Sequence, residues 1–93
     1  MSFLKRLFGG GEKADAPEVA KEIEHKGFVV RATPYKRDGQ YQTSGTVSKE
    51  IGGVVKEHKF VRADRFSSKE DVVSFSLAKG RQIIDEQGER IFN

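Results

Sequence analysis

Apolar and polar side chains alternate along most of residues 28–63 with the period expected of β-strands. Residues 28–36 are rich in β-forming side chains, and Pro34 places this run at a sheet edge because proline has no N–H to donate to a neighbouring strand. Residues 41–51 place apolar and polar side chains on alternate sides, and residues 54–63 form a third run. The pattern predicts three consecutive strands.

Two short turn sequences connect these runs. Asp38-Gly39 and Gly52-Gly53 are typical of two-residue hairpin turns, in which both central residues need a positive φ. Tight turns make the strands antiparallel and set their register. In that register Val30 lies opposite Val47, and Val47 lies opposite His58. We therefore expect an apolar centre on one face of the sheet, with Phe60 lying over a glycine at position 45.

Helical periodicity replaces the strand pattern after residue 67. Ser68 followed three residues later by Asp71 fits the sequences that cap helix N-termini. We expect a helix from Lys69 to about Gln87, ended by Gly88. Its apolar stripe is expected to contain Val73, Leu77, Gly80, Ile84 and eventually Ile91, and to be widened by Val72, Phe75 and Ile83. Two i, i+4 ion pairs are expected on its solvent side, Arg81 with Asp85 and Glu86 with Arg90.

Together these elements predict an α+β fold in two layers over residues 27–93, a three-stranded antiparallel β-meander packed against one long C-terminal helix. A domain of this size buries a small core, so a homodimer or the N-terminal segment could be needed to complete it. Residues 1–26 are expected to be an amphipathic segment followed by a flexible linker, because residues 12–26 are charged and carry few large apolar groups.

The N-terminal amphipathic segment has an apolar face of its own, formed by Phe3, Leu4, Leu7 and Phe8. Three glycines then end the pattern at residues 9–11. A two-turn helix is marginal in water and needs a surface to lie against. Two interpretations stay open: a tail that frays or docks on its own domain, and a segment that docks on a partner protein or makes peripheral contact with a membrane.

Composition argues against catalysis. The chain has no cysteine, which excludes disulfides and thiolate metal ligands, and its two histidines are His25 and His58. We expect His25 in the linker and His58 on the packed sheet face, where a structural role is favoured over a metal or catalytic one. No glycine-rich phosphate loop joins a strand to a helix. We therefore expect no enzyme activity, no metal, no cofactor and no small-molecule substrate.

The cellular location is inferred from the lack of a predicted membrane-crossing segment. No run approaches the roughly 18 apolar residues that cross a bilayer, so a cytoplasmic protein is expected.

Basic residues concentrate in the predicted sheet. The formal net charge is +3, and residues 27–66 carry eight Lys or Arg against four Asp or Glu. The register predicts three rows on the polar face: Arg31–Thr46–Lys59, Thr33–Ser44–Val61 and Tyr35–Gln42–Ala63. Cations beside an aromatic ring can bind phosphates and stack a base. The candidate nucleic-acid contacts are Arg31, Tyr35, Lys36, Arg37, Lys59, Arg62 and Arg65.

Several segments also carry a family resemblance. They are Lys26-Gly27-Phe28, Asp38-Gly39-Gln40-Tyr41, residues 58–71 and residues 79–92. On these segments, and on its opening ten residues, the chain resembles the small proteobacterial family named for HlyU, an activator of haemolysin expression. The resemblance implies transcriptional activation, with DNA or another transcription regulator as the partner, and carries over no catalytic or metal-binding residue.

Two hypotheses for the function remain at this point. The first is a transcription regulator that binds nucleic acid or another regulator on its basic sheet face. The second is a non-catalytic protein-interaction or membrane-peripheral module that uses the apolar N-terminal segment.

Overall fold

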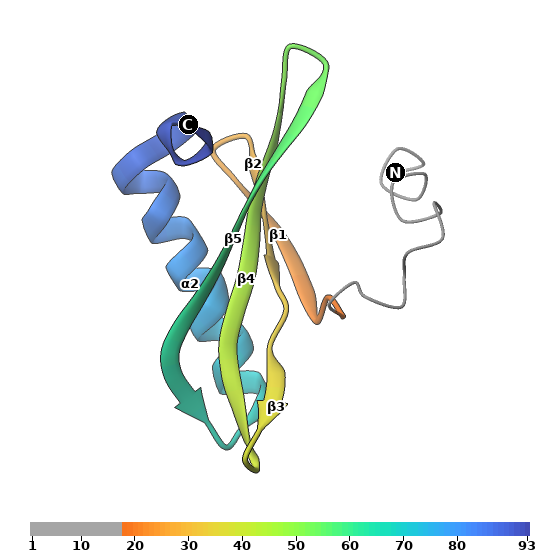
Figure 1. Cartoon of the computed structure of the whole chain (residues 1–93), viewed down its shortest axis with the longest axis vertical. Helices are drawn as coiled ribbons and strands as arrows, with labels where there is room; N and C mark the ends of the chain where they lie inside the picture. The colour runs from red at the N-terminus through yellow and green to blue at the C-terminus, as the bar shows by residue number, and fades with distance from the viewer. Residues whose placement is uncertain (1–17) are drawn as a thin grey trace.

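One antiparallel sheet backed by one helix makes up the computed structural model, which describes residues 18–93 (Figure 1). The elements are β1 (Lys21–His25), β2 (Phe28–Ala32), β3 (Tyr35–Arg37), β4 (Gln40–Ile51), β5 (Val54–Phe66), α2 (Lys69–Gln87) and the 3₁₀ helix η2 (Gly88–Phe92). The fold class is α+β, as the sequence predicts. The sheet, however, has five strands where three were expected.

Both additional strands have a local cause. Pro34 divides the first predicted strand into β2 and β3, which pair with different parts of β4. The other addition is β1, which lies in the segment expected to be a linker. A third two-residue turn at Lys26-Gly27, with φ of 53° and 84°, folds β1 back onto β2. Ile23 then points to the helix side and packs against the core.

The predicted register is confirmed over most of the sheet. Val47 lies between Val30 and His58, and Thr46 lies between Arg31 and Lys59. The exception is the row that was expected to end at Ala63.

A bulge in β5 displaces that last row, so that Gln42 lies opposite Arg65. Residues 62–64 of β5 span the position of Thr43 alone. Thr43 Oγ1 donates to the Asp64 carbonyl oxygen at 2.9 Å, and the Gln42 side-chain amide donates to the Arg62 carbonyl. Side-chain hydrogen bonds thus replace ladder bonds in the bulge.

The core lies between the sheet and α2. Its buried residues are Phe28, Val30, Ala32, Val47, Phe60, Leu77, Ile83, Ile84 and Ile91. Two glycines allow close packing: a Cβ at Gly80 would lie 2.3 Å from Val30 Cγ1, and one at Gly45 would lie 2.6 Å from Phe60 Cζ. The expected placement of Phe60 over Gly45 is therefore confirmed.

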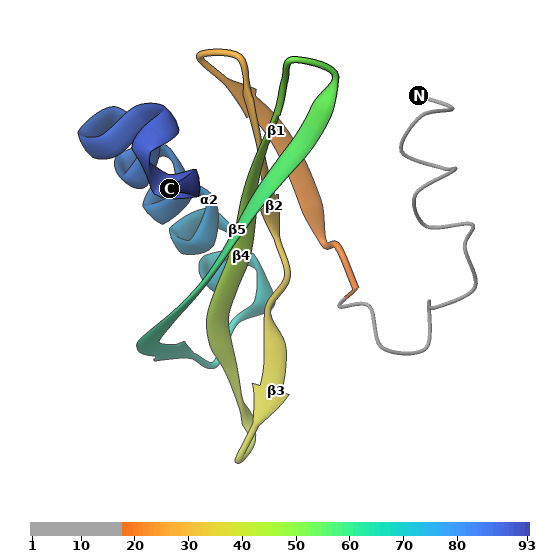
Figure 2. The same cartoon turned by 45° about the horizontal axis from the view of Figure 1, so that its top comes forward.

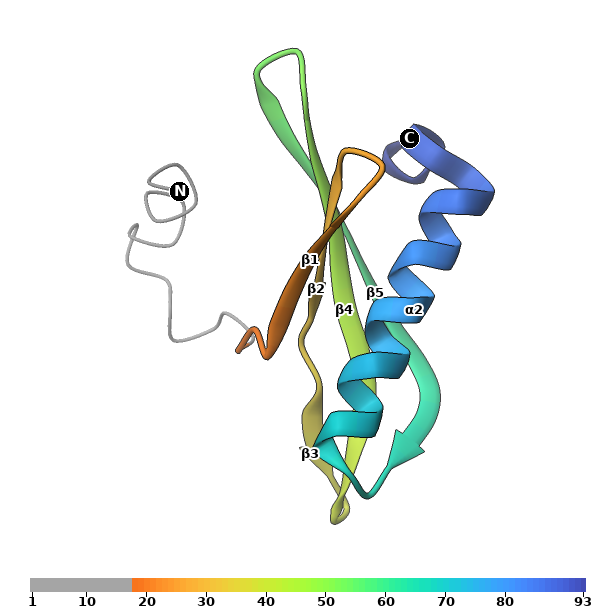
Figure 3. The same ribbon diagram turned by 180° about the vertical axis from the view of Figure 1, so that it is seen from behind.

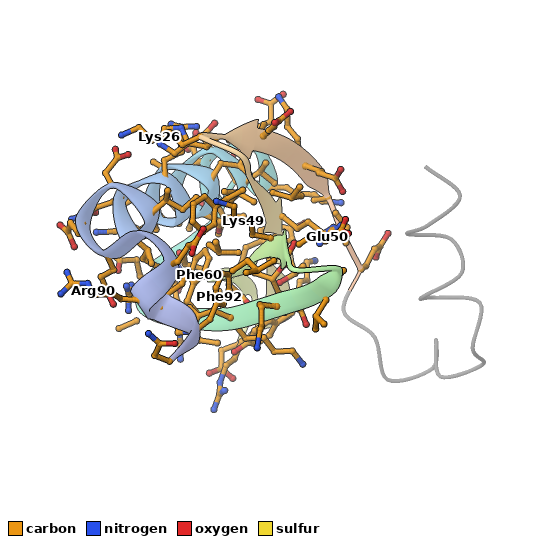
Figure 4. The ribbon with its side chains drawn as sticks, turned by 90° about the horizontal axis from the view of Figure 1, so that it is seen from above. Lys26, Lys49, Glu50, Phe60, Arg90 and Phe92 are labelled. Atoms are coloured by element: carbon orange, nitrogen blue, oxygen red, sulfur yellow. The ribbon has the colours of Figure 1, made fainter. Side chains whose placement is uncertain are left out.

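The bounds predicted for the helix are confirmed. Ser68 caps it by accepting a hydrogen bond from the Asp71 backbone N–H, and Gly88, with φ of 57°, ends it. The chain then folds back, and the ring of Phe92 stacks on that of Phe28 at 6.1 Å between centroids. Seen from above, Phe60 and Phe92 lie between the helix and the sheet (Figure 4).

The ion pairs expected on the helix, Arg81–Asp85 and Glu86–Arg90, do not form within residues 18–93. Asp85 Oδ1 instead lies 2.8 Å from both Lys26 Nζ and His25 Nε2. Hydrogen bonds from Lys26 and then His25 lower the pKa of Asp85 below its ordinary value of 3.8. Arg90 donates to two backbone carbonyls at the end of α2. Asp85 thus connects α2 to the β1–β2 turn through His25 and Lys26.

Candidate nucleic-acid interface

Among residues 18–93, α2 covers one face of the sheet, and no helix of this part of the chain covers the other face (Figure 3). We call the second the open face. Directly paired residues share a face, so the row of Glu22, Arg31, Thr46 and Lys59 lies on it. This is the face on which nucleic-acid contacts were expected.

Arg31 is not an available cation on the open face. Its side chain is 6% exposed, and its Nε donates to Glu22 Oε1 at 2.9 Å. A second guanidinium nitrogen donates to Ser48 Oγ at 3.2 Å. Glu22 was not expected as a partner, because residues 12–26 have the composition of a linker. Arg31 therefore joins β1, β2 and β4 and has its charge neutralised within the sheet.

Near the β1–β2 and β4–β5 hairpins the open face is acidic. Figure 2 shows these two hairpins at the same end of the sheet. A groove of about 410 Å³ there is lined by residues that include Glu22, Glu24 and Glu50. Figure 4 shows Glu50 together with its neighbour Lys49, which turns to the helix side and binds Glu89 at 2.8 Å. The carboxylates make this end unfavourable for a polyanion.

The opposite end of the sheet is basic and formed by the β3–β4 hairpin, which extends beyond the body of the sheet (Figure 1). Tyr35, Lys36 and Arg37 are all exposed. Asp38-Gly39 forms the turn with φ of 54° and 82°, as predicted from the sequence. Tyr35 and Arg37 share the open face, whereas Lys36 points to the helix side, with its Nζ 5.6 Å from the Tyr41 ring centroid.

Arg65 supports this hairpin from β5. Its Nε donates to Gln42 Oε1 at 3.1 Å, and its Nη1 lies 3.5 Å from Asp38 Oδ2. The bulge brings Arg65 opposite Gln42, so this contact was not predictable from a regular ladder. Arg65 therefore holds the hairpin in place and is partly neutralised by Asp38.

Arg62 and Lys59, the other two predicted contacts on β5, are exposed. The Arg62 guanidinium carbon lies 6.0 Å from the ring centroid of Phe60. Arg62 also lies in the bulge, close to the β3–β4 hairpin. Lys59 lies opposite Thr46, four residues along β4 from the position of Gln42 that pairs with Tyr35.

Four of the predicted cations lack a carboxylate oxygen within 4.0 Å in the part of the chain from 18 to 93: Lys36, Arg37, Lys59 and Arg62. Arg31 and Arg65 do have acidic partners. The structure thus divides the seven predicted contacts into two paired arginines, four cations unpaired over residues 18–93, and Tyr35, a residue that is 41% exposed.

Metal ions, membranes and the N-terminal apolar residues remain to be considered. Over residues 18–93 no group of three or more His, Cys, Asp or Glu side chains could hold a metal ion. No helix in the same part of the chain is long and apolar enough to cross a membrane. The apolar residues Phe3, Leu4, Leu7 and Phe8 lie outside the described residues, and their docking role stays a prediction.

Comparison with protein families gives a match that covers nearly the whole chain. The family described as transcriptional activator HlyU matches residues 2–92. Neither the curated proteins nor the solved structures include a match.

Proposed function

Because the chain belongs to the family of the transcriptional activator HlyU, we propose that it regulates transcription by binding DNA through the β3–β4 hairpin end of its sheet. The observation that carries this proposal is the position of the unpaired cations. Lys36, Arg37 and Arg62 lie at that end, exposed and without a carboxylate within 4.0 Å among residues 18–93.

A hairpin of this shape suits the major groove. B-DNA's major groove is about 12 Å wide and admits a two-stranded β-ribbon as well as an α-helix. The type I′ turn and the support of Arg65 hold the β3–β4 ribbon in one conformation, so little ordering is needed on binding. Tyr35 adds an exposed aromatic ring beside Arg37 on the ribbon's open face.

The distribution of charge along the sheet determines which end of the molecule faces the DNA. Carboxylates of Glu24 and Glu50 lie at the far end of the sheet and would repel phosphates, whereas the ribbon end attracts them. Arg31 and Lys59 are not part of the proposed surface, because Arg31 is paired with Glu22 and Lys59 lies farther along the sheet.

The test is a titration of labelled duplex DNA by fluorescence anisotropy at about 20 mM salt, with the double variant Lys36→Glu/Arg37→Glu. We expect this variant to lose at least about tenfold in affinity, since each lost phosphate contact also removes a released counterion. The control, Lys56→Glu/Arg81→Glu, makes the same change in net charge at two exposed positions away from the ribbon.

The two double variants separate local contact from overall charge. A larger loss in Lys36→Glu/Arg37→Glu than in the control supports the proposed surface. Equal losses, or no binding by the unmodified chain at low salt, would overturn it.

A further inference from the structure

The longest strand of the sheet has a free edge. β5 pairs with β4 on one side, and no other strand within residues 18–93 pairs with its opposite side. The helix α2 packs mainly on β2 and β4 and contacts β5 less. A free edge presents backbone N–H and C=O groups that can pair with another strand.

The turn geometry identifies which backbone groups face outward. Gly52-Gly53 is a two-residue turn with φ of 60° and 82°, so the flanking residues Ile51 and Val54 form a hydrogen-bonded pair. Hydrogen-bonded and non-hydrogen-bonded pairs then alternate along β4 and β5. The residues whose backbone groups point away from β4 are Val55, Glu57, Lys59 and Val61. The bulge at residues 62–64 ends this regular edge.

We propose that two copies of the chain associate by antiparallel pairing of this edge, about a two-fold axis that passes through His58. Each copy then contributes the same segment, Val55–Val61, to a sheet that continues across both chains. His58 lies opposite His58 of the second copy as a non-hydrogen-bonded pair. The ladder hydrogen bonds are made by the outward-facing residues on either side of it.

Charge complementarity selects this register. A two-fold at His58 places Glu57 opposite Lys59 of the second copy and Lys59 opposite its Glu57. The same register places Val55 opposite Val61 twice. A two-fold at Glu57 or at Lys59 would instead bring two like charges directly together, which destabilises a cross-strand pair.

Two-fold axes at residues 56 and 60 keep neither the Glu57–Lys59 charge pairs nor the Val55–Val61 apolar pairs. An axis at residue 56 places Glu57 opposite Val55, and an axis at residue 60 places Lys59 opposite Val61 and extends the ladder into the bulge. The axis at residue 58 is therefore the one that combines opposite charges, apolar pairs and a bulge-free ladder.

The side chains at this edge are available for such a contact. Glu57 and Lys59 are both exposed, and Lys59 has no carboxylate within 4.0 Å in its own chain over residues 18–93. Val61 is 56% exposed, a large fraction for an apolar side chain in a strand. The pairing leaves the β3–β4 hairpin uncovered, so it does not depend on DNA binding.

The first test is a charge exchange followed by sedimentation equilibrium between about 10 µM and 1 mM, a range suited to an interface smaller than the standard size. We expect Glu57→Lys and Lys59→Glu each to weaken association by about tenfold or more, and the double variant to restore it to within about threefold. Lys56→Glu is the matched control: it lies on the same exposed strand but points to the helix side.

Several results would overturn the pairing: a monomer at about 1 mM, no weakening in the single variants, no recovery in the double variant, or equal weakening by Lys56→Glu. Each of these is read without DNA, so the outcome is independent of the proposed function.

The second test uses the absence of cysteine from the chain. His58→Cys is expected to form a disulfide between copies under mild oxidation, because Cα atoms of a non-hydrogen-bonded pair lie about 4.5 Å apart. Lys56→Cys is expected not to, since residue 56 lies opposite residue 60 and its two copies are separated by roughly 13 Å. Equal cross-linking at the two positions would contradict the register.

Discussion

Arg31 and Glu22 form an ion pair across the first two strands of the sheet, with 2.9 Å between Nε and Oε1. Glu22 comes from a segment that has the composition of a linker, and Arg31 from the expected ligand-binding face. Because of this pair, Arg31 has a structural role and is not available as a DNA contact. The pair also stabilises β1 in the sheet, because Glu22 on β1 neutralises the buried guanidinium of Arg31 on β2.

The first prediction concerns this pair. Glu22→Gln should lower the free energy of unfolding by about 1–2 kcal/mol, because it leaves a buried guanidinium without its carboxylate while Glu22 itself is partly exposed. Urea unfolding followed by circular dichroism measures the change. Glu24→Gln is the control on the same strand, and its change should stay within about 0.5 kcal/mol. Similar losses in the two variants would contradict a specific role for Glu22.

The second prediction tests the close contact of α2 with the sheet. Gly80→Ala should destabilise the fold by about 1–3 kcal/mol, although alanine favours helices, because the added methyl would lie 2.3 Å from Val30 Cγ1. Adding Val30→Ala makes room for that methyl, so the double variant should cost less than the sum of the single ones. Additive unfolding free energies in this double-mutant cycle would exclude the contact.

The third prediction is a pH dependence at Asp85. Hydrogen bonds from Lys26 and His25 lower the pKa of this carboxyl in the folded chain, so its contribution to stability is present above the unfolded pKa and is lost as the pH falls through the folded one. The urea midpoints of the unmodified chain and of Asp85→Asn should therefore differ at pH 6 and converge as the pH falls through the lowered pKa of Asp85. Glu86→Gln, on the same exposed side of the helix, should show no such convergence, since no cation pairs with Glu86 over residues 18–93.

The fourth prediction concerns the salt dependence of DNA binding. With three phosphate contacts from Lys36, Arg37 and Arg62, the slope of log K against log salt should be about −3, and Arg37→Ala should reduce its magnitude by about 1. Titrations between about 20 and 200 mM salt measure both slopes. An Arg81→Ala control should keep the full slope, because Arg81 lies on the solvent side of α2. An unchanged slope in Arg37→Ala would remove Arg37 from the contact surface.

Much of the sheet was predictable because hairpin turns are local. Asp38-Gly39 and Gly52-Gly53 adopt the positive φ values that such turns need, and the register from Val30 to Val47 to His58 follows from them. The Lys26-Gly27 turn was missed, since lysine seldom takes a positive φ and the strand before it contains a single large apolar residue, Ile23.

Part of the candidate site was not predictable, because it depends on which charged side chains meet in space. The seven proposed contacts were chosen as basic or aromatic residues of the sheet. Arg31 pairs with Glu22, which lies on a strand that the hydrophobic pattern did not predict. The bulge in β5 places Arg65 within reach of Asp38 and Gln42. Asp85 likewise binds the β1–β2 turn and not its helical neighbour Arg81.

The amino-acid sequence by itself determined the α+β class, the three central runs of strand, the helix from Lys69 to Gln87 and the family resemblance, because strand period, turn chemistry and helix capping act over a few residues. The tertiary structure alone decided that β1 joins the sheet, that the bulge shifts β5, and which cations stay unpaired. Those outcomes depend on contacts between residues distant in the chain, whose energies a local pattern does not contain.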